Sequence, residues 1–507
     1  MIFRSMTFIF LTLLLKTSFS QPGFQKTYSI EDRGTAFHNM ILKDDTLIVA
    51  GIHFSDEPVP RQGILFAKLD TFGNMLNYTF HLDSLGDDYA LDNNYDFIPL
   101  SDGGYALVGV PFARKGGFLM KFDVNGNQVF VREYADSTVR NAGLRNVIEV
   151  EDGFLIAGVE QNLDYSNNIH IKRLNSSGDI LWHKSYGAPL EIDVLGSLLK
   201  LDNQTFVIGA ARGSQWDIPI EDRWFQSRII IINGQGDILW SWASTLNVEN
   251  GIVGLNPTQD GGWIYCSNNL EISEYNDFNR YPKIVKRDSQ MNLEWEQVVD
   301  VELLTSNTYI DLKPNADTSA WIGIGNWAPE LGTEIWGGSC IYKISPEGEK
   351  LWTRCDTVPW AEPTNSREYY GGMVVLPSGS IIAAGRSDKS FPNPKLSFGW
   401  LVKTDKNGCV DTLCHLNTAI LEQQSAKTIK AFPNPADDRL TIDFGEQHYQ
   451  VANVSGFHAT GKQLFTQEIK QYRPTLQLDV SQVPPGMLFL RVIVDHQKGQ
   501  TIKVMIY

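Results

Sequence analysis

Aromatic and charged residues that suit ligand recognition gather in the long connecting segments in the middle of this chain. Aromatic rings bury a large area at a small entropic cost, and a neighbouring charged group orients a polar ligand. The sequence therefore predicts a shallow binding site formed by Trp216, Asp217, Trp224, Tyr275, Arg280, Tyr281, Trp327 and Trp336. The alternative is that these rings only pack against the loops that carry them.

Signatures of catalysis are weak by comparison. The chain has no G-x-S-x-G, H-E-x-x-H or phosphate-loop motif, and its 9 histidines are scattered. Acidic pairs such as Asp87-Asp88, Glu151-Asp152 and Glu221-Asp222 suit the acid and base of a glycosidase, but such pairs also occur in solvated turns. These observations favour a non-catalytic module that binds a glycan or a protein, with a secreted polysaccharide hydrolase as the alternative. They predict neither a metal site nor a cofactor.

The elements that position these residues repeat along the chain. An apolar strand that ends in glycine recurs at Gly51, Gly109, Gly158, Gly209, Gly325 and Gly385. A tight turn between two alternating strands recurs roughly every 50 to 60 residues, at Gly73, Gly126, Gly178, Gly236, Met291, Gly348 and Gly408. Each repeat therefore predicts four short strands, and about seven repeats predict a β-propeller. A solenoid is the alternative.

Some repeats also carry a Gly-x-x-x-Trp element, which ends at Trp182, Trp240 or Trp352. These elements resemble the tryptophan motifs of quinoprotein propellers. They fit equally well with simple packing between neighbouring blades.

The start of the chain and its charge indicate export. Arg4 and the short apolar run 7–15 are followed by Ser18 and Ser20, which predicts a signal peptide over residues 1–20. No later segment is apolar and long enough to cross a membrane, so the mature chain is expected to have no transmembrane segment. The formal net charge of -16 argues against a nucleic-acid partner.

The mature N-terminus and the cysteines predict two further features. The segment 24–29 resembles the last strand of a repeat, so we expect it to complete the final blade and close the ring. Disulfides are permitted in an exported chain. Cys340 and Cys355 flank a turn almost symmetrically, so we expect them to form a disulfide across the hairpin. Cys409 and Cys414 lie close together and are a second candidate pair, whereas Cys266 falls inside an apolar strand.

The last part of the chain has a different pattern. Alternating strands and Pro-Gly turns predict a small antiparallel sandwich over residues 429–507. These residues also resemble the type A C-terminal sorting domain of the type IX secretion system, and the motif positions are Pro433, Asn434, Pro435, Gly486 and Lys503.

That resemblance implies delivery through the periplasm and across the outer membrane, with the secretion machinery as partner and a secreted or cell-surface location. The repeats similarly resemble propeller modules of exported Bacteroidetes-type proteins, a likeness of architecture that implies no activity. The predicted class is all-β: a signal peptide (1–20), a β-propeller of about seven blades (21–416), a linker (417–428) and a sandwich sorting domain (429–507).

Overall fold

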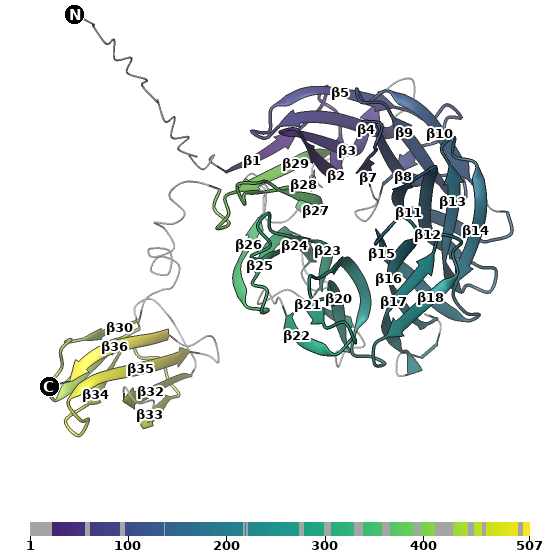
Figure 1. Cartoon of the computed structure of the whole chain (residues 1–507). Coiled ribbons are helices and arrows are strands. Elements are labelled where there is room, and N and C mark those ends of the chain that lie inside the picture. The colour runs from purple at the N-terminus through teal and green to yellow at the C-terminus, as the bar shows by residue number, and fades with distance from the viewer. Residues whose placement is uncertain are drawn as a thin grey trace, which may run out of the picture. The chain divides into compact units, whose positions relative to one another are not determined.

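The computed structural model describes residues 23–55, 61–91, 97–135, 137–215, 218–219, 222–272, 278–298, 306–328, 338–356, 366–389, 396–410, 429–444, 451–458, 463–494 and 500–506. These residues form strands and turns and include no α-helix (Figure 1). The chain divides into two compact units, Met1–Thr412 and Leu413–Tyr507. The all-β prediction is confirmed. The predicted signal peptide and the predicted linker at 417–428 lie outside the described residues.

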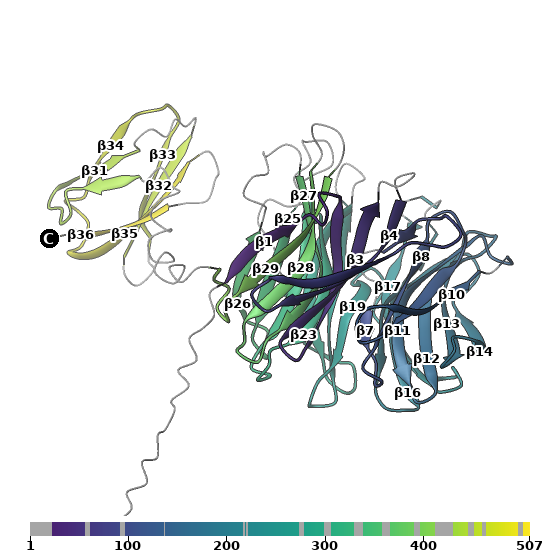
Figure 2. The ribbon, with the colours of Figure 1, turned by 90° about the horizontal axis from the view of Figure 1, so that it is seen from above.

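In the first unit, antiparallel pairing groups the described strands into seven meanders, and two neighbouring pairs of meanders are joined by a single parallel bridge each, Asn167 to Ile192 and Arg280 to Ser306. The meanders are arranged around a common axis (Figures 1 and 2). We number these blades 1 to 7 and call their strand positions A (innermost) to D (outermost). Blade 1 consists of β2 (Thr35–Lys43), β3 (Thr46–Ser55), β4 (Arg61–Asp70) and β5 (Met75–His81). In blade 2, β6 (Tyr89–Ala90) and β7 (Phe97–Pro99) share position A, followed by β8 (Tyr105–Pro111), β9 (Gly117–Phe122) and β10 (Gln128–Tyr134). Blade 3 consists of β11 (Asn141–Val150), β12 (Gly153–Gln161), β13 (Asn167–Asn175) and β14 (Ile180–Tyr186).

The remaining blades follow the same order. Blade 4 consists of β15 (Glu191–Lys200), β16 (Thr205–Ser214), β17 (Phe225–Asn233) and β18 (Ile238–Ala243), and blade 5 of β19 (Asn250–Pro257), β20 (Trp263–Ile272), β21 (Phe278–Arg287) and β22 (Leu293–Val298). Blade 6 consists of β23 (Ser306–Pro314), β24 (Trp321–Ala328), β25 (Gly338–Ile344) and β26 (Lys350–Asp356). Blade 7 consists of β27 (Ser366–Val375), β28 (Ile381–Lys389), β29 (Leu396–Thr404) and β1 (Phe24–Tyr28).

The N-terminal strand closes the ring. Strand β1 pairs antiparallel with β29 of blade 7, in a register that runs from Phe24 opposite Lys403 to Tyr28 opposite Gly399. The expectation that the segment 24–29 completes the last blade is therefore confirmed, with Ser29 just beyond the strand. Because β1 covers β29, the first and last parts of the propeller are held together by backbone hydrogen bonds.

The glycine that recurs in strand B has a steric cause. In blade 3, the register of strand A shifts at Arg145, which forms a β-bulge, and the strands of blades 1, 4, 6 and 7 shift at the corresponding place. A Cβ atom on Gly158 would lie 1.7 Å from the carbonyl oxygen of Gly143 in that bulge. The equivalent glycines of blades 1 and 7, Gly51 and Gly385, meet a bulge carbonyl in the same way. A glycine in strand B therefore leaves room for the bulge.

The turn that follows strand C is built alike in every blade; it leads to strand D in blades 1 to 6, whereas the D strand of blade 7 is the N-terminal β1. In blade 2, Asp123 Oδ1 accepts hydrogen bonds from the backbone N–H groups of Asn125 and Asn127, both at 2.8 Å. Gly126 has a φ of 90°, a conformation that favours glycine. The same pair of hydrogen bonds is accepted in the other blades by Asp70, Asn175, Asn233, Asp288, Ser345 and Asp405.

At three of the described interfaces, a tyrosine at the end of strand D holds the C–D turn of the next blade. Tyr134 Oη donates to the carbonyl oxygen of Gly178 at 2.8 Å, and Tyr186 Oη donates to that of Gly236 at 2.7 Å. Tyr28 does the same across the closure, to Gly73 at 2.7 Å. The interface closed by the N-terminal strand is thus built like the interfaces inside the ring.

The tryptophans of the Gly-x-x-x-Trp elements take part in this contact. A Cβ on Gly236 would lie 2.9 Å from the ring of Trp182, and a Cβ on Gly408 would lie 3.0 Å from the ring of Trp352. These rings therefore pack on the turn of the neighbouring blade, which supports the packing alternative. Trp240 is 39% exposed.

The second unit is a sandwich of two antiparallel sheets. One sheet contains β30 (Lys430–Phe432), β31 (Arg439–Asp443) and β34 (Thr475–Asp479), and the other contains β32 (Ala452–His458), β33 (Gln463–Ile469), β35 (Gly486–Val494) and β36 (Gln500–Ile506). Alternate residues of both sheets, such as Leu440, Val454 and Leu490, are buried in a shared core.

Candidate functional site

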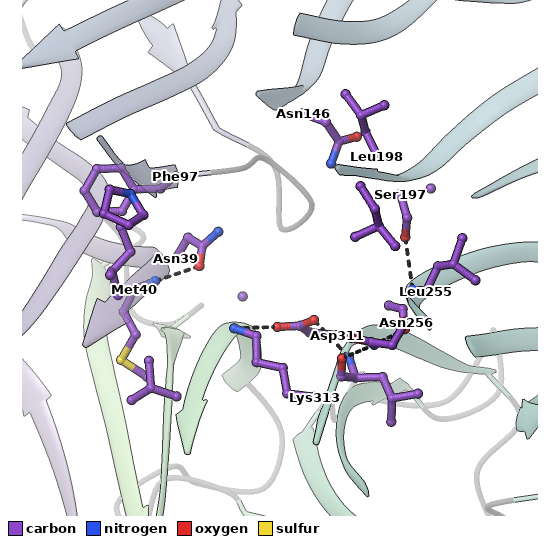
Figure 3. A pocket seen from close by; sticks show the side chains of 18 of the residues that line it. Asn39, Met40, Phe97, Asn146, Ser197, Leu198, Leu255, Asn256, Asp311 and Lys313 are labelled. Atoms are coloured by element: carbon purple, nitrogen blue, oxygen red, sulfur yellow. Dashed lines mark hydrogen bonds and ion pairs between the residues drawn. The ribbon is translucent and has the colours of Figure 1, made fainter. Parts of the chain in front are cut away.

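A cavity of about 430 Å³ lies on the axis of the propeller, where the A strands of the blades converge (Figure 3). Strands β2, β7, β11, β15, β19, β23 and β27 all contribute to its lining. Met40, Phe97 and Leu198 supply apolar surface, while Asn39, Asn146, Ser197, Asn256, Asp311 and Lys313 supply the polar side chains. We call this the axial cavity.

Two of these side chains present unused hydrogen-bonding groups. Asn256 Nδ2 donates to the carbonyl oxygens of Gly254 at 2.9 Å and Leu312 at 2.8 Å, which ties blade 5 to blade 6. Its Oδ1 accepts no hydrogen bond from the described residues. Ser197 Oγ accepts from the N–H of Leu255 at 3.4 Å, and its hydroxyl proton has no acceptor within the described ranges. The cavity therefore offers both an acceptor and a donor to a ligand.

The charge inside the cavity is balanced. Asp311 is the only carboxylate among the described lining residues, and its Oδ2 lies 3.1 Å from Lys313 Nζ. The ammonium also donates to the carbonyl oxygen of Met373 at 2.7 Å, which links blade 6 to blade 7. An uncharged ligand thus meets no unpaired charge in this cavity.

The axial cavity lies away from the predicted loop site. Each A strand runs from the connection between blades to the A–B turn, and the lining residues begin at the bulge and continue toward that turn. The B–C loops leave the blades at the opposite end of the strands. The two candidate sites are therefore on different faces of the propeller.

The structure leaves the predicted loop site untested. Trp216, Asp217, Tyr275 and Trp336 lie outside the described residues, and only the backbone is described for Arg280, Tyr281 and Trp327. That backbone places Arg280 and Tyr281 at the start of β21 and Trp327 near the end of β24. Trp224 precedes β17, is half-buried, and its N–H donates to Ser214 Oγ at 3.2 Å. These four residues lie at the B–C end of blades 4, 5 and 6.

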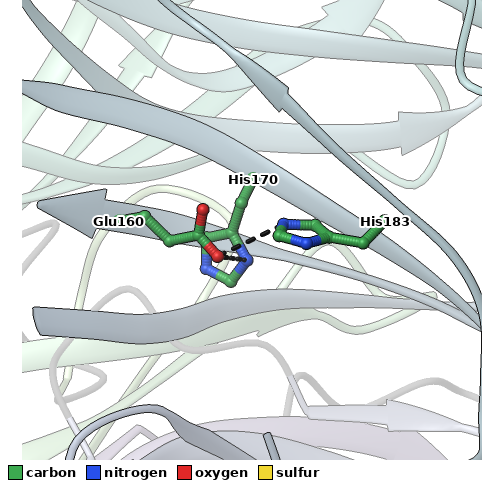
Figure 4. Close-up of side chains that lie close together, drawn as sticks. All are labelled: Glu160, His170 and His183. Carbon is green, nitrogen blue, oxygen red and sulfur yellow. Dashed lines mark ion pairs between the residues drawn. The ribbon is translucent and has the colours of Figure 1, made fainter. Parts of the chain in front are cut away.

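Sequence analysis missed a cluster of polar groups inside blade 3 (Figure 4). Glu160 Oε1 lies 3.3 Å from His170 Nδ1 and 3.2 Å from His183 Nε2, and both Glu160 and His170 are buried. The side chains come from adjacent strands, at alternating positions on one face of the sheet. The spacing His170-x-Lys172, opposite His183 in the predicted hairpin, is the signal that could have revealed this grouping.

This cluster already holds a cation of its own. Lys172 Nζ lies 3.1 Å from Glu160 Oε1, 2.8 Å from His170 Nδ1 and 3.5 Å from His183 Nε2. A divalent ion could bind Glu160, His170 and His183 only if the Lys172 ammonium moved away, because two cations this close together repel each other strongly. The arrangement is therefore a buried ion-pair network rather than an open metal site.

The pKa values within the cluster follow from burial and charge. Burial raises the pKa of the Glu160 carboxyl, but the hydrogen bond from His183 and the nearby basic groups outweigh it and lower that pKa to about 2. Burial, and next the charge of Lys172, lower the pKa of His170 to about 4. Near neutral pH the cluster contains an ionised glutamate and a neutral His170.

Two of the three acidic pairs considered for catalysis are engaged in local structure. Asp87 accepts hydrogen bonds from the N–H of Ala113, and Asp88 Oδ1 accepts from the N–H of Gln62 at 2.8 Å. Glu151-Asp152 lies in the A–B turn of blade 3, on the face away from the long loops, and Asp152 pairs with Arg173. Glu221 lies outside the described residues.

The cysteines are arranged as follows. Cys340 and Cys355 form a disulfide, and they are directly opposite each other in β25 and β26. Cys409 is also disulfide-bonded, and Cys414 lies outside the described residues. Cys266 is a buried free thiol.

In the second unit, the motif Pro433-Asn434-Pro435 is attached to the last strand. Asn434 Nδ2 donates to the carbonyl oxygen of Lys503 at 3.0 Å, and its Oδ1 accepts from the N–H of Met505 at 2.9 Å. The side-chain amide thus bonds to β36 as a backbone amide would. Lys503 Nζ lies 5.9 Å from the centre of the Phe489 ring, and Gly486 has a φ of 134° at the start of β35.

Residues 430–507 match the family of secretion system C-terminal sorting domains. The second unit is therefore a type IX sorting domain, and the chain is exported to the cell surface or the extracellular space. The sorting domain also implies an interaction with the secretion machinery. No helix among the described residues is apolar and long enough to span a membrane.

Comparison with solved structures gives matches of low similarity. One is the β-propeller domain of the Trilobed protease from Pyrococcus furiosus, with 9% identity and a TM-score of 0.38 over 75% of this chain and 98% of that chain. Another is an α-L-arabinofuranosidase from Fusarium graminearum, with 12% identity and a TM-score of 0.42 over 64% of this chain and 97% of that chain. No curated protein matches the chain. Superpositions this loose carry no information on activity.

Proposed function

We propose that this exported propeller is a non-catalytic binding protein whose axial cavity holds a neutral glycan. The observation that carries the proposal is the lining of that cavity: amide and hydroxyl groups, apolar side chains, and one carboxylate already paired with a lysine. Sugar hydroxyls both donate and accept hydrogen bonds, and sugar C–H faces pack on apolar side chains. A neutral saccharide therefore suits both the polar and the apolar parts of the lining.

Hydrolysis of polysaccharide is the alternative outcome. Glycosidases generally need two carboxyl groups about 5 to 9.5 Å apart beside the scissile bond. Asp311 has no second carboxylate beside it in the described lining. Activity on chromogenic glycosides, lost in Asp311→Asn, would replace the binding proposal with a catalytic one.

The test is a screen of neutral oligosaccharides on an array, followed by calorimetry with the best ligand. Asn256→Ala removes an acceptor from the cavity, so we expect about ten-fold weaker binding. Asn125→Ala, in an outer turn of blade 2, is the control and should bind as the wild type does. Unchanged affinity in a folded Asn256→Ala variant would place the ligand elsewhere.

The predicted loop residues provide the second arm of that test. A glycan or protein partner bound at the B–C end of blades 4 to 6 would depend on Trp224 and Trp327, because buried aromatic anchors dominate binding energy. We expect Trp224→Ala or Trp327→Ala to reduce affinity by about ten-fold for such a partner and to leave binding in the axial cavity unchanged.

A further inference from the structure

A second cavity, of about 390 Å³, lies at the B–C end of blades 2 and 3. Its lining includes the end of β8, the start of β11, the end of β12 and the start of β13. Unlike the axial cavity, it presents guanidinium groups, from Arg114 and Arg145, together with the amides of Asn141, Gln161 and Asn167. We call it the Arg145 cavity.

The two guanidinium groups differ in what they bind. Arg114 is neutralised within the protein, since its guanidinium lies 2.8 Å from Asp83 and 2.5 Å from Glu133, with Asp87 at 3.5 Å. Arg145 makes no ion pair with any described residue, and its Nη1 donates only to the carbonyl oxygen of Leu195, at 3.4 Å. The Arg145 guanidinium is therefore the group in this cavity that is free to bind an anion.

The position of Arg145 explains why it reaches the cavity. It is the residue at which the register of β11 shifts, and a bulge redirects the side chain of the residue that it leaves unpaired. The corresponding bulge positions of blades 4 and 7 are Gly196 and Gly371, which have no side chain. Blade 3 thus carries a cation at a place where those blades carry none.

A hydrogen-bond acceptor lies in the same cavity. Asn167 Oδ1 is buried and has no hydrogen-bond donor among the described residues. Buried acceptors in folded proteins are nearly always satisfied, so a donor from a ligand or a water completes this site. A ligand hydroxyl beside a carboxylate would supply both missing partners, one for Asn167 and one for Arg145.

We propose that the Arg145 cavity binds a hydroxylated carboxylate, namely a uronic acid unit of an acidic saccharide. The carboxylate pairs with the Arg145 guanidinium, a charge-assisted interaction with favourable planar geometry. A ring hydroxyl donates to Asn167 Oδ1. The whole chain carries a formal net charge of -16, so this local cation provides the attraction that the rest of the protein does not.

Ligand-observed NMR with D-galacturonate tests the proposal on the full mature chain, with D-galactose as the neutral analogue. We expect galacturonate to bind about ten-fold or more tightly than galactose, because galactose leaves Arg145 without a partner. Oligogalacturonate forms the second arm. It should bind more tightly than the monosaccharide if the natural source is a polymer, and equally if a free uronate is the ligand.

Arg145→Gln should reduce galacturonate affinity by about ten- to a hundred-fold and remove the preference over galactose. Arg132→Gln is the matched control: Arg132 also donates to a single carbonyl oxygen, that of Ser177, but it lies on the outer strand β10. If Arg145→Gln does not fold, Asn167→Asp keeps the shape of the cavity and repels the carboxylate instead.

Equal affinity for the two sugars, or undiminished galacturonate binding in folded Arg145→Gln and Asn167→Asp, would overturn this proposal. The neutral-glycan function is judged separately, by its dependence on Asn256 in the axial cavity. Either proposal can therefore fail while the other stands.

Discussion

The outer turns and the inner bulges of the propeller are both repeated, but they repeat in different ways. The C–D turns repeat residue types as well as geometry, as Asp70, Asp123 and Asp288 show with the same two hydrogen bonds. The bulges in the A strands repeat only the backbone shift: the residue there is His38 in blade 1 and Arg145 in blade 3. Positions where the side chain is repeated hold the blades together, whereas positions where only the backbone is repeated leave the side chain available for binding.

The largest effect should come from the backbone of a bulge. Gly158→Ala places a Cβ 1.7 Å from the carbonyl oxygen of Gly143, so the strand pair must separate or the bulge must change. We expect a loss of about 3 kcal/mol in the free energy of unfolding, measured by denaturant titration. Gly86→Ala, with nothing within 4 Å of its Cβ, should cost only about 1 kcal/mol, from its φ of 88°. Equal costs would contradict the steric explanation.

The charged network of blade 3 should produce the next largest effect, as a pH dependence. The pKa of His170 is about 4 in the fold against 6.5 for a free histidine, so the unfolded chain binds the extra proton between these values. Stability should therefore fall by about 2 to 3 kcal/mol as the pH drops from 6.5 to 4. Glu160, with a pKa of about 2 against 4.5, continues the loss below pH 4.5.

His170→Gln should flatten the upper part of that pH profile, since a glutamine binds no proton in the unfolded chain. Melting temperatures of the wild type and the variant between pH 4 and 7 provide the measurement. A wild-type profile that stays level across this range would show that the fold does not lower the pKa of His170.

The hydrogen bonds between blades should each contribute less. Tyr186→Phe removes the donor to Gly236 and should cost about 1 kcal/mol, the usual net value of one hydrogen bond. Tyr28→Phe removes the equivalent bond at the closure and should cost the same. A much smaller cost at Tyr28 would mean that the N-terminal strand opens before the rest of the ring.

The smallest effect on stability should come from a bulge side chain. Arg145→Gln should change the free energy of unfolding by no more than about 0.5 kcal/mol, because the side chain is half-buried and makes no ion pair in the described part of the chain. Thermal melts beside the galacturonate titration provide the check. A large loss of stability would show that the Arg145 side chain stabilises the fold, as the turn residues do.

The repeats were readable from the sequence because they depend on local chemistry. A tight turn selects glycine at Gly126 and an acidic residue at Asp123, and these preferences act within five residues of chain. The closure by the segment 24–29 was also predictable, since Tyr28 belongs to the same pattern as Tyr134 and Tyr186. The sorting domain was recognisable from its motif residues, among them Pro433, Asn434 and Gly486, although the contacts of Asn434 with β36 are long-range.

The candidate sites depended on the tertiary structure. Ser197, Asn256 and Asp311 belong to the A strands of three consecutive blades, and the packing of these blades side by side brings them to one cavity. Arg145 resembles any other strand residue until the bulge in β11 redirects it. The sequence by itself therefore determined the repeating unit, because short-range sterics and hydrogen bonds specify its turns. It also revealed the closing strand and the sorting domain, because their residue patterns are recognisable. Only the packing of blades against one another decided which polar side chains meet, because those contacts join residues that no local pattern connects.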